Sequence, residues 1–389
     1  MKRNNYWKIL FAMAGGIIGL NVLGLIPGVC DFYADYIYIY INAFFGMLTS
    51  WCPFALGEII MYLGAAAVVV QIMTWVLLAF LHERKGYVHF MRIYSKALLM
   101  TACVFLLLYT TNWFIPFKAS VLQVSENERT SFTLEEVAFV RNMAVNELNR
   151  IVEEVERDEA GNLVFNYTEE DIKSAMKAMQ GQYKRLAGFY PNSKENLCSP
   201  FLEWMGIGGY NYVYTMEPSY NKFVTSLYKP VLLAHELAHN KGYYKENEGE
   251  FLSCIALINS DNLLLQYSGY SEILAYIQDD FADALYDSLF DSDKPFTKED
   301  MEILKAAYDQ YPQLSKQFYI DYEYAQNQVD KLYEESVSPV LEETFSEVSA
   351  EVADVGWEVQ GDILKENTYS GLSLMLLRYF VTSHSYANH

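Results

Sequence analysis

The sequence has little positive charge. Among its 389 residues, 28 lysines and arginines stand against 49 aspartates and glutamates, so the formal net charge at pH 7 is −21. A chain this acidic is repelled by nucleic acid. It also contains no cluster of basic and aromatic residues and no glycine-rich loop of the kind that holds phosphate groups. We therefore expect no nucleic-acid partner.

Cysteine is also scarce, and the five cysteines include no C-x-x-C pair. Cys30 and Cys52 flank one loop, while Cys198 and Cys254 lie in the C-terminal part of the chain. An oxidising exterior would permit either pair to form a disulfide, but the sequence leaves the connectivity open. Cys103 is expected to be a buried thiol in an apolar helix.

Long apolar runs, by contrast, are plentiful near the N-terminus. Three stretches reach or approach the roughly 20 residues that a helix needs to cross a bilayer, at 7–27, about 53–80 and about 97–117. Residues 1–116 carry seven basic and four acidic side chains, a net charge of +3, whereas the rest of the chain carries −24. We therefore predict a membrane domain over 1–117 and a second, acidic domain over 118–389.

The distribution of charge predicts an orientation for the spans. Basic residues flank the first span and lie between the second and third, at Lys2, Arg3, Lys8, Arg84, Lys85, Arg92 and Lys96. The loop at about 28–51 contains Asp31 and Asp35 but no lysine or arginine, and part of it is expected to form a surface helix. The positive-inside rule then places the N-terminus in the cytoplasm and the acidic domain outside the cell membrane. Glu58 in the second span is expected to reach water or to dock on that domain.

The pentapeptide His235-Glu236-Leu237-Ala238-His239 is the strongest indication of chemistry. An α-helix turns once per about 3.6 residues, so the two imidazoles lie on one face and can bind one metal ion. Glu236 lies beside that face, within reach of a water molecule. H-E-x-x-H is the minimal zinc-hydrolase motif, with two ligands, a general base and an open coordination position. The alternative is a helix with two merely hydrogen-bonded histidines.

A third protein ligand is needed, and the remaining histidines are poorly placed to supply it, at His82, His89, His384 and His389. A carboxylate is expected instead. Glu246, Glu248 and Glu250 follow a predicted turn at Gly242 and begin a predicted second helix. Acidic residues also suit a helix N-terminus without any metal, and the residues alone leave the choice among the three open.

The block at 206–270 resembles a family of uncharacterised bacterial membrane proteins with a predicted zincin-type peptidase site. The motif at 235–242, Glu246-x-Glu248 before Phe251, the segment 266–270 and Asp362-Ile363-Leu364-Lys365 carry the resemblance. It implies three N-terminal spans, an outer zincin-like domain and Zn²⁺ as cofactor. Many zincins carry the third ligand in E-x-x-A-D or E-x-x-A-N. Matching that pattern makes Glu246 the ligand, with Gly249 and Glu250 as departures in the last two places.

Local signals predict a mainly α chain (α+β). Helices are expected at 133–158, 168–186, 271–289, 297–311, 312–335 and 339–365, and the apolar segment 369–381 is too short to span a membrane. Thr133 and Thr168 have the spacing of helix N-caps. Aromatic and β-branched residues at 210–216 predict a strand, and the alternatives are that an extended substrate adds to it or that it only packs. The predicted fold is therefore three transmembrane helices followed by a mostly helical zincin-like domain with a small β element.

These features predict a membrane-anchored zinc metallopeptidase acting on a peptide or protein substrate, with His235, His239 and Glu246 as ligands and Glu236 as base. A tyrosine is expected to stabilise the transition state, with Tyr212, Tyr243 and Tyr244 as candidates. A non-enzymatic membrane module with a structural metal or a ligand-binding site is one alternative. A metal-dependent hydrolase of a non-peptide bond is another.

Overall fold

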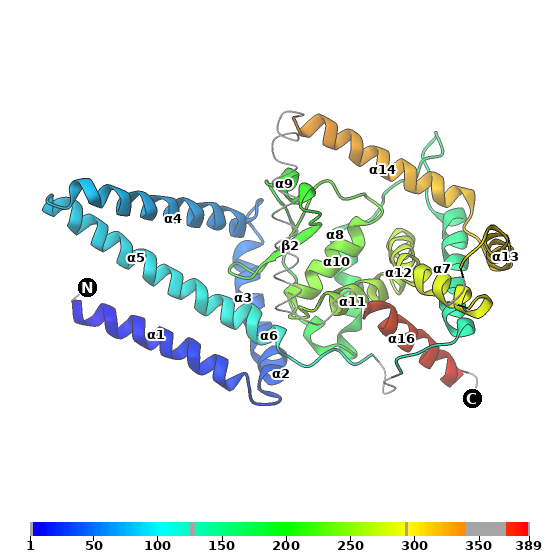
Figure 1. The fold of residues 1–389 in the computed structure, drawn as a ribbon, viewed down its shortest axis with the longest axis horizontal. Coiled ribbons are helices and arrows are strands. Elements are labelled where there is room, and N and C mark those ends of the chain that lie inside the picture. The colour runs from blue at the N-terminus through cyan, green and yellow to red at the C-terminus, as the bar shows by residue number, and fades with distance from the viewer. Residues whose placement is uncertain (1–2, 125–128, 292–294, 339–370, 388–389) are drawn as a thin grey trace.

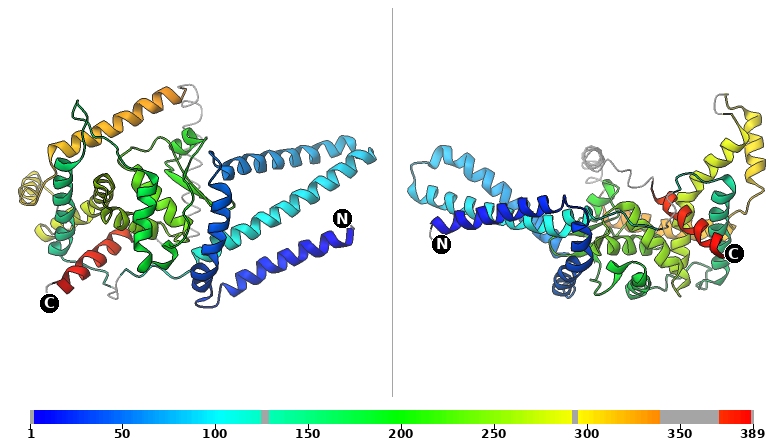
Figure 2. Two further views of the ribbon diagram at one scale, coloured as in Figure 1. Left: turned by 180° about the vertical axis from the view of Figure 1, so that it is seen from behind. Right: turned by 90° about the horizontal axis from the view of Figure 1, so that it is seen from below.

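Three long helices project from one side of a mostly helical body (Figure 1). The computed structural model describes residues 3–124, 129–291, 295–338 and 371–387. The predicted mainly α fold with a small β element is confirmed. The two further views show the same projecting helices beside the body (Figure 2).

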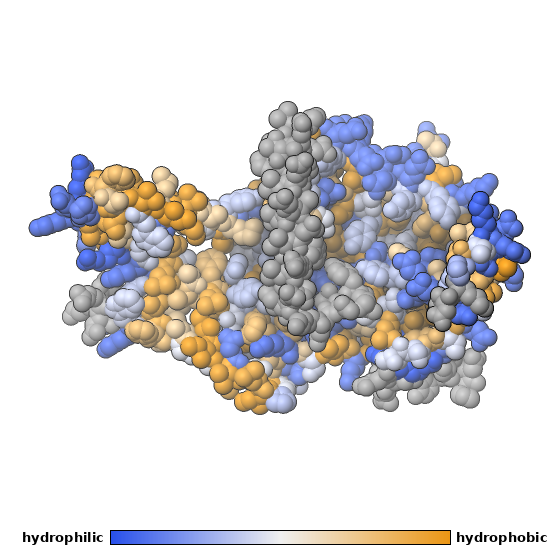
Figure 3. Space-filling view, viewed as in Figure 1, coloured by the Kyte–Doolittle hydropathy of each residue, from blue (hydrophilic) through white to orange (hydrophobic). Residues whose placement is uncertain are grey.

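The projecting helices are α1 (Arg3–Leu23), α4 (Leu56–Leu81) and α5 (Lys85–Tyr109), and α5 continues through η2 (Thr110–Phe114) into α6 (Ile115–Phe117). All three are long and apolar enough to cross a membrane. Hydrophobic residues cover them, and hydrophilic residues gather at the end furthest from the body (Figure 3). The third helix begins twelve residues earlier than predicted, at Lys85 rather than at Ala97. Its added turns are held against α4, because Tyr94 donates to the carbonyl oxygen of Ala67 at 2.7 Å.

The segment between the first two spans is helical, as α2 (Val29–Tyr33), η1 (Ala34–Tyr38) and α3 (Ile39–Thr49). Its polar side chains face the body. The Tyr38 hydroxyl donates to the carbonyl oxygen of Asn240 at 3.0 Å, and Asn42 donates to the same residue. This segment therefore joins the projecting helices to the body.

Predicted helix caps mark two helices of the body. Thr133 and Glu136 form a capping box at α7 (Leu134–Glu154), and Thr168 and Asp171 form another at α8 (Glu169–Ala178). α8 is shorter than predicted, because the chain tightens into the 3₁₀ turns η3 (Met179–Gly181) and η4 (Lys184–Leu186). α12 (Leu263–Leu289) begins earlier than predicted, because the Asn262 side chain accepts hydrogen bonds from the first backbone amides.

The C-terminal helices are α13 (Lys298–Tyr308), α14 (Lys316–Ser336) and α16 (Leu372–Ala387). α16 packs on α7, α11 (Glu246–Ile258) and α12, where the rings of Phe251 and Tyr379 lie 5.6 Å apart. This apolar segment therefore belongs to the core of the body. The helix predicted at 339–365 lies outside the described residues.

The sheet has three short strands, β1 (Lys194–Glu195), β2 (Gly209–Tyr212) and β3 (Glu217–Tyr220), in the order β1-β3-β2. β2 pairs antiparallel with β3, which pairs parallel with β1. The strand predicted at 210–216 is correct only in its first half. The chain then turns back, with Met216 at a φ of 55°, and β2 is left as an edge strand. The short helix α9 (Ser199–Trp204) lies between β1 and β2 in the sequence.

All five cysteines are free thiols, so neither possible disulfide is present. Cys30, Cys52 and Cys254 are buried, while Cys103 is only partly buried. Cys103 was expected to be buried inside the protein, but α5 turns much of its surface outward.

Candidate metal centre

The H-E-x-x-H motif lies on α10 (Lys229–Asn240), which is buried over almost its whole length. Pro230 occupies the first turn, where its missing amide hydrogen costs nothing. Gly242, at a φ of +89°, turns the chain away after the helix ends. The predicted turn at Gly242 is confirmed, and it leads into α11.

α11 approaches the two histidines unusually closely, and Gly249 permits this. A Cβ atom at this position would lie 3.2 Å from the His235 ring and 3.3 Å from the His239 ring. A larger residue would therefore push α11 away from α10. This contact gives a physical reason for glycine at one of the two places where the sequence departs from the usual zincin pattern.

Three donor atoms converge between these helices. Oε2 of Glu246 lies 3.0 Å from Nε2 of His235 and 3.5 Å from Nε2 of His239. Ligands about 2.0–2.1 Å from a tetrahedral zinc ion are separated by about 3.3 Å. Among the described residues, this is the only group of three or more histidine, cysteine or acidic side chains with donor atoms all within 4.8 Å of one another.

The other ring nitrogens are fixed by acceptors. Nδ1 of His235 lies 2.7 Å from a carboxylate oxygen of Glu250, and Nδ1 of His239 lies 2.8 Å from the carbonyl oxygen of Tyr243. An acceptor at Nδ1 requires the hydrogen there, which leaves the lone pair of Nε2 free for a metal. Both imidazoles are therefore oriented as metal ligands usually are.

The three glutamates of α11 have three different positions. Glu246 faces both Nε2 atoms, and Glu250 orients His235 from behind. Glu248 accepts a hydrogen bond from the backbone amide of Leu122 at 2.6 Å. The geometry therefore favours Glu246 as third ligand among the candidates left open by the sequence.

The pKa shifts within the cluster have the directions expected where carboxylates and imidazoles share positive charge. Burial alone would lower the pKa of His235, but the hydrogen bonds that its ring donates to Glu246 and Glu250 outweigh burial and raise this pKa well above its usual value. Burial and the charge of His235 would also lower the pKa of His239, but the charge of Glu246 and its hydrogen bond with His239 raise this pKa overall. The imidazoles in turn overcome the effect of burial on Glu246 and hold its pKa far below the usual range. A divalent cation would supply the same positive charge as these protons.

Glu236 is 4% exposed, and burial raises its pKa to about 7. Its Oε2 has no hydrogen-bond partner within the part of the chain that the structure describes. A buried carboxylate oxygen without a partner is costly unless a water molecule or ligand satisfies it. The donor set and this oxygen therefore fit a metal site with an adjacent base.

β2 runs along the face of α10 that carries Glu236. Gly208 lies against Leu232, and Gly209 lies against Glu236. The Asn240 side chain donates a hydrogen bond to the Asn211 side chain at 3.2 Å. A Cβ atom at Gly209 would lie only 2.5 Å from Oε1 of Glu236. The edge strand therefore lies directly beside the candidate base.

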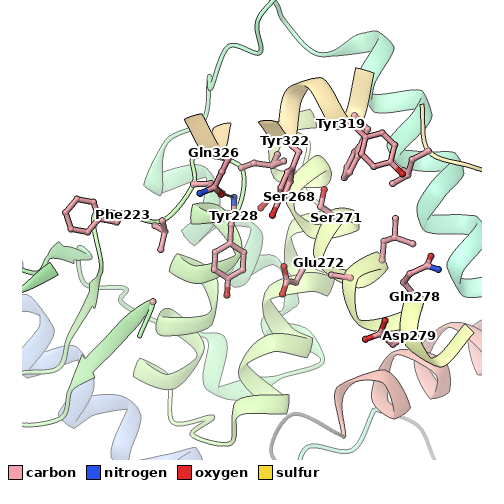
Figure 4. A pocket seen from close by; sticks show the side chains of 18 of the residues that line it. Phe223, Tyr228, Ser268, Ser271, Glu272, Gln278, Asp279, Tyr319, Tyr322 and Gln326 are labelled. Carbon is pink, nitrogen blue, oxygen red and sulfur yellow. Dashed lines mark hydrogen bonds between the residues drawn. The ribbon is translucent and has the colours of Figure 1, made fainter. Parts of the chain in front are cut away.

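A cavity of about 800 Å³ begins where β2 begins. Gly206, Ile207 and Gly208 line one end, and Glu272 of α12 and Tyr228 point into it (Figure 4). Burial and then the charge of nearby Glu250 raise the pKa of Glu272 well above its usual value. The cavity therefore extends from the residues just before β2 to Glu272, whose carboxylate interacts with that of Glu250.

The projecting helices dock beside this site. Tyr244 stacks on the His239 ring at a centroid distance of 6.0 Å, and its hydroxyl donates to the carbonyl oxygen of Asn112 at 2.7 Å. Glu58 accepts hydrogen bonds from the amides of Leu197 and Cys198, both at 2.8 Å. The prediction that Glu58 docks on the body is confirmed.

Two of the tyrosines considered as transition-state donors are engaged elsewhere. The Tyr244 hydroxyl lies in the network with Asn112 and Tyr38, and the Tyr212 hydroxyl donates to Asn196 at 2.8 Å. Tyr243 contributes its backbone carbonyl to His239, while its ring lies beside the guanidinium of Arg185. His82 and His89 are exposed at the far end of the projecting helices, and the side chains of His384 and His389 are outside the described part.

A family model covers residues 33–339 of the chain. The chain belongs to the family described as protein of unknown function (DUF3810). This DUF3810 match runs from the last residue of α2 through α14 and contains every residue of the candidate metal centre. Searches of curated proteins and of solved structures give no match. The family description assigns no activity, so the zincin resemblance stays a prediction.

Sequence reasoning missed three features of the site. Glu250 was considered only as a ligand, although its position one helical turn after Glu246 places it on the same face. The glycines at 208 and 209 signal the close approach of the backbone to α10, which sequence reasoning does not include. The contacts of Tyr38 and Asn42 with the end of α10 left no local signal, because about 200 residues separate the partners.

Proposed function

We propose that this DUF3810 protein is a membrane-anchored zinc metallopeptidase. The observation that supports the proposal is the convergence of His235, His239 and Glu246 beside a buried Glu236 with an unpartnered oxygen. The reaction would be peptide hydrolysis, in which water adds to the carbonyl carbon, the C–N bond breaks and the nitrogen receives a proton.

Each residue of the centre has a defined task. A bound zinc ion would supply a Lewis acid that polarises the peptide carbonyl and lowers the pKa of water. His235, His239 and Glu246 would hold it, and Glu250 keeps His235 in the required tautomer. Glu236 takes a proton from the attacking water and passes it to the leaving amine. Burial suits this task, because it brings the pKa of Glu236 to about 7, near neutral pH.

The distribution of basic residues supports a location for the metal centre relative to the membrane. Basic residues gather at the end of the projecting helices furthest from the body, including Arg84, Lys85 and Arg92. The positive-inside rule favours the cytoplasm for that end. The body and its metal centre would then lie on the outer side of the cell membrane, and the N-terminus in the cytoplasm.

The alternative, a membrane module with a structural metal, calls for a fourth protein ligand. Within the described residues the cluster contains three ligands. A structural site also has no use for Glu236 beside it. These two observations favour a hydrolytic centre over a structural one.

The proposal is tested on the purified full-length protein, by zinc content and by hydrolysis of a random peptide pool. The wild-type protein should hold about one zinc ion per chain, and His239→Ala should lose it. Glu236→Gln should retain zinc while hydrolysis falls by a factor of about 100 to 10,000. His89→Ala, at an exposed histidine far from the cluster, is the matched control and should change neither quantity.

Two results would contradict the proposal. The first is full peptide turnover by Glu236→Gln, because this variant lacks the carboxylate proposed as the base. The second is hydrolysis of ester or non-peptide amide substrates with no hydrolysis of peptides, which would assign the centre to a different reaction.

A further inference from the structure

The strand beside the candidate base also touches a membrane helix. Tyr212, at the end of β2, packs so tightly on Gly57 that no side chain fits there. Its partner in β3, Glu217, accepts hydrogen bonds from the amides of Leu56 at 3.2 Å and Gly57 at 2.9 Å. This carboxylate caps the N-terminus of α4, where it is favoured by the helix dipole. The sheet and the first turn of the span are therefore joined.

The turn after β2 contacts a second membrane helix. The Tyr214 ring lies 4.8 Å from that of Phe105 in α5, and Asn112 donates to the carbonyl oxygen of Val213 at 2.9 Å. The hairpin points into the space where α4 and α5 diverge toward the body (Figure 1). Toward their far ends these helices are held together, because Ser95 donates to Gln71 at 3.0 Å.

The distance from the base to the membrane helix is short. Gly209 lies against Glu236, and Tyr212, three residues later, lies against the first turn of α4. A strand rises about 3.3 Å per residue, so these two contacts are about 10 Å apart along β2. That length corresponds to three or four residues of an extended peptide.

We propose that the substrate is a membrane-anchored polypeptide, which the protein cuts within a few residues of the point where the polypeptide leaves the bilayer. This inference rests on the peptidase function proposed above. An edge strand presents unpaired amide and carbonyl groups to which an extended chain can add. A chain added to β2 and extending past Tyr212 arrives between α4 and α5.

The part of such a substrate chain that lies further from the membrane also has a binding site available. Beyond Gly209, the extended substrate meets Gly208 and the cavity that Gly208 lines. Its acidic and basic side chains are Glu203, Glu272 and Asp279 and one arginine, Arg141, whose guanidinium is hydrogen-bonded to Gln278 and Tyr308. The part of the substrate further from the membrane would therefore occupy an acidic, aromatic cavity. The anchor raises the effective concentration of the scissile segment at β2.

The test uses the full-length protein in liposomes, loaded with zinc. The probes share one block of randomised sequence. In one set the block directly follows an apolar transmembrane anchor, and in a second set it follows a palmitoyl chain. In a third set a flexible linker of about 15 residues separates the block from the anchor, and this linker reaches well beyond 10 Å. The fourth set has no anchor. Mass spectrometry of the products gives the rate and the position of each cut.

Both directly anchored sets should be cut at least about 10-fold faster than the linked and free sets, through effective concentration. Their cuts should fall within about four residues of the anchor, the length that β2 spans. Faster cutting of the transmembrane set alone would restrict the substrate to membrane-spanning proteins. Equal rates for all four sets, or cuts at positions independent of the anchor, would overturn the inference and leave the peptidase function intact. No cutting of any set would overturn the peptidase function itself.

Discussion

Nδ1 of His235 lies 2.7 Å from Oε2 of Glu250. This pair decides which nitrogen of His235 is free, because a carboxylate at Nδ1 retains the hydrogen there. The Glu250 side chain is almost fully buried, at 4% exposure, so little solvent screens the contact. In the proposed metal centre, Glu250 is therefore placed to orient the ligand His235 from behind.

Glu250→Gln should weaken zinc binding while leaving the fold intact. The amide retains the shape of the side chain but loses the charge that orients and polarises His235, so zinc affinity should fall about 10- to 100-fold. Competition with a coloured chelator measures it. Glu248→Gln is the matched control, since this buried glutamate on the same helix contacts Leu122 and not a histidine. An equal loss in both variants would show that the effect is not specific to His235.

Gly209→Ala should abolish most activity without removing the metal. The added methyl group would lie 2.5 Å from Oε1 of Glu236, so either the base or β2 must move. A displacement of about 1 Å at a reacting group costs on the order of 100-fold in rate. Gly181→Ala is the control, because a Cβ atom there meets nothing within 4 Å. Loss of zinc from Gly209→Ala would instead indicate that the strand supports the ligands.

Zinc affinity should rise with pH. In the metal-free protein the pKa values of His235 and His239 are raised, so both imidazoles tend to hold protons that a metal must displace. Raising the pH removes this competition, and the affinity should increase at least about 10-fold from about pH 6 to about pH 8 before levelling off. Isothermal titration in two buffers of different ionisation enthalpy would also count the released protons. An affinity independent of pH, with no proton release, would exclude the imidazoles as ligands.

Glu58→Ala should destabilise the docking of α4 on the body. The substitution leaves the amides of Leu197 and Cys198 without their carboxylate acceptor, which costs about 1–3 kcal/mol for each buried group that stays unsatisfied. Thermal unfolding of the protein in detergent measures the loss. Glu83→Ala, at a side chain that is 90% exposed, is the control and should leave the melting temperature unchanged. Identical melting of both variants would show that water replaces the lost acceptor.

The sequence was sufficient for features that depend on neighbouring residues. The spacing of His235 and His239 places both on one helical face, and Thr133 and Thr168 mark helix starts that the structure confirms. Apolar runs of sufficient length predicted all three helices that are long and apolar enough to cross a membrane. Local signals failed at boundaries set by packing. The turn that shortens the strand at 210–216 is one such boundary, because the chain folds back there against α4 and α5.

Tertiary structure alone decided how these parts act together. Glu246, Glu248 and Glu250 are chemically identical in the sequence, and only the approach of α11 to α10, permitted by Gly249, gives each a different partner. The same holds for Gly209, whose importance depends on the Glu236 carboxylate that packs against it. Helix periodicity and capping are determined within a few residues, so the sequence expresses them directly. The partner of each glutamate and the distance from Glu236 to α4 depend on contacts between segments far apart in the chain, which arise only when the whole core packs.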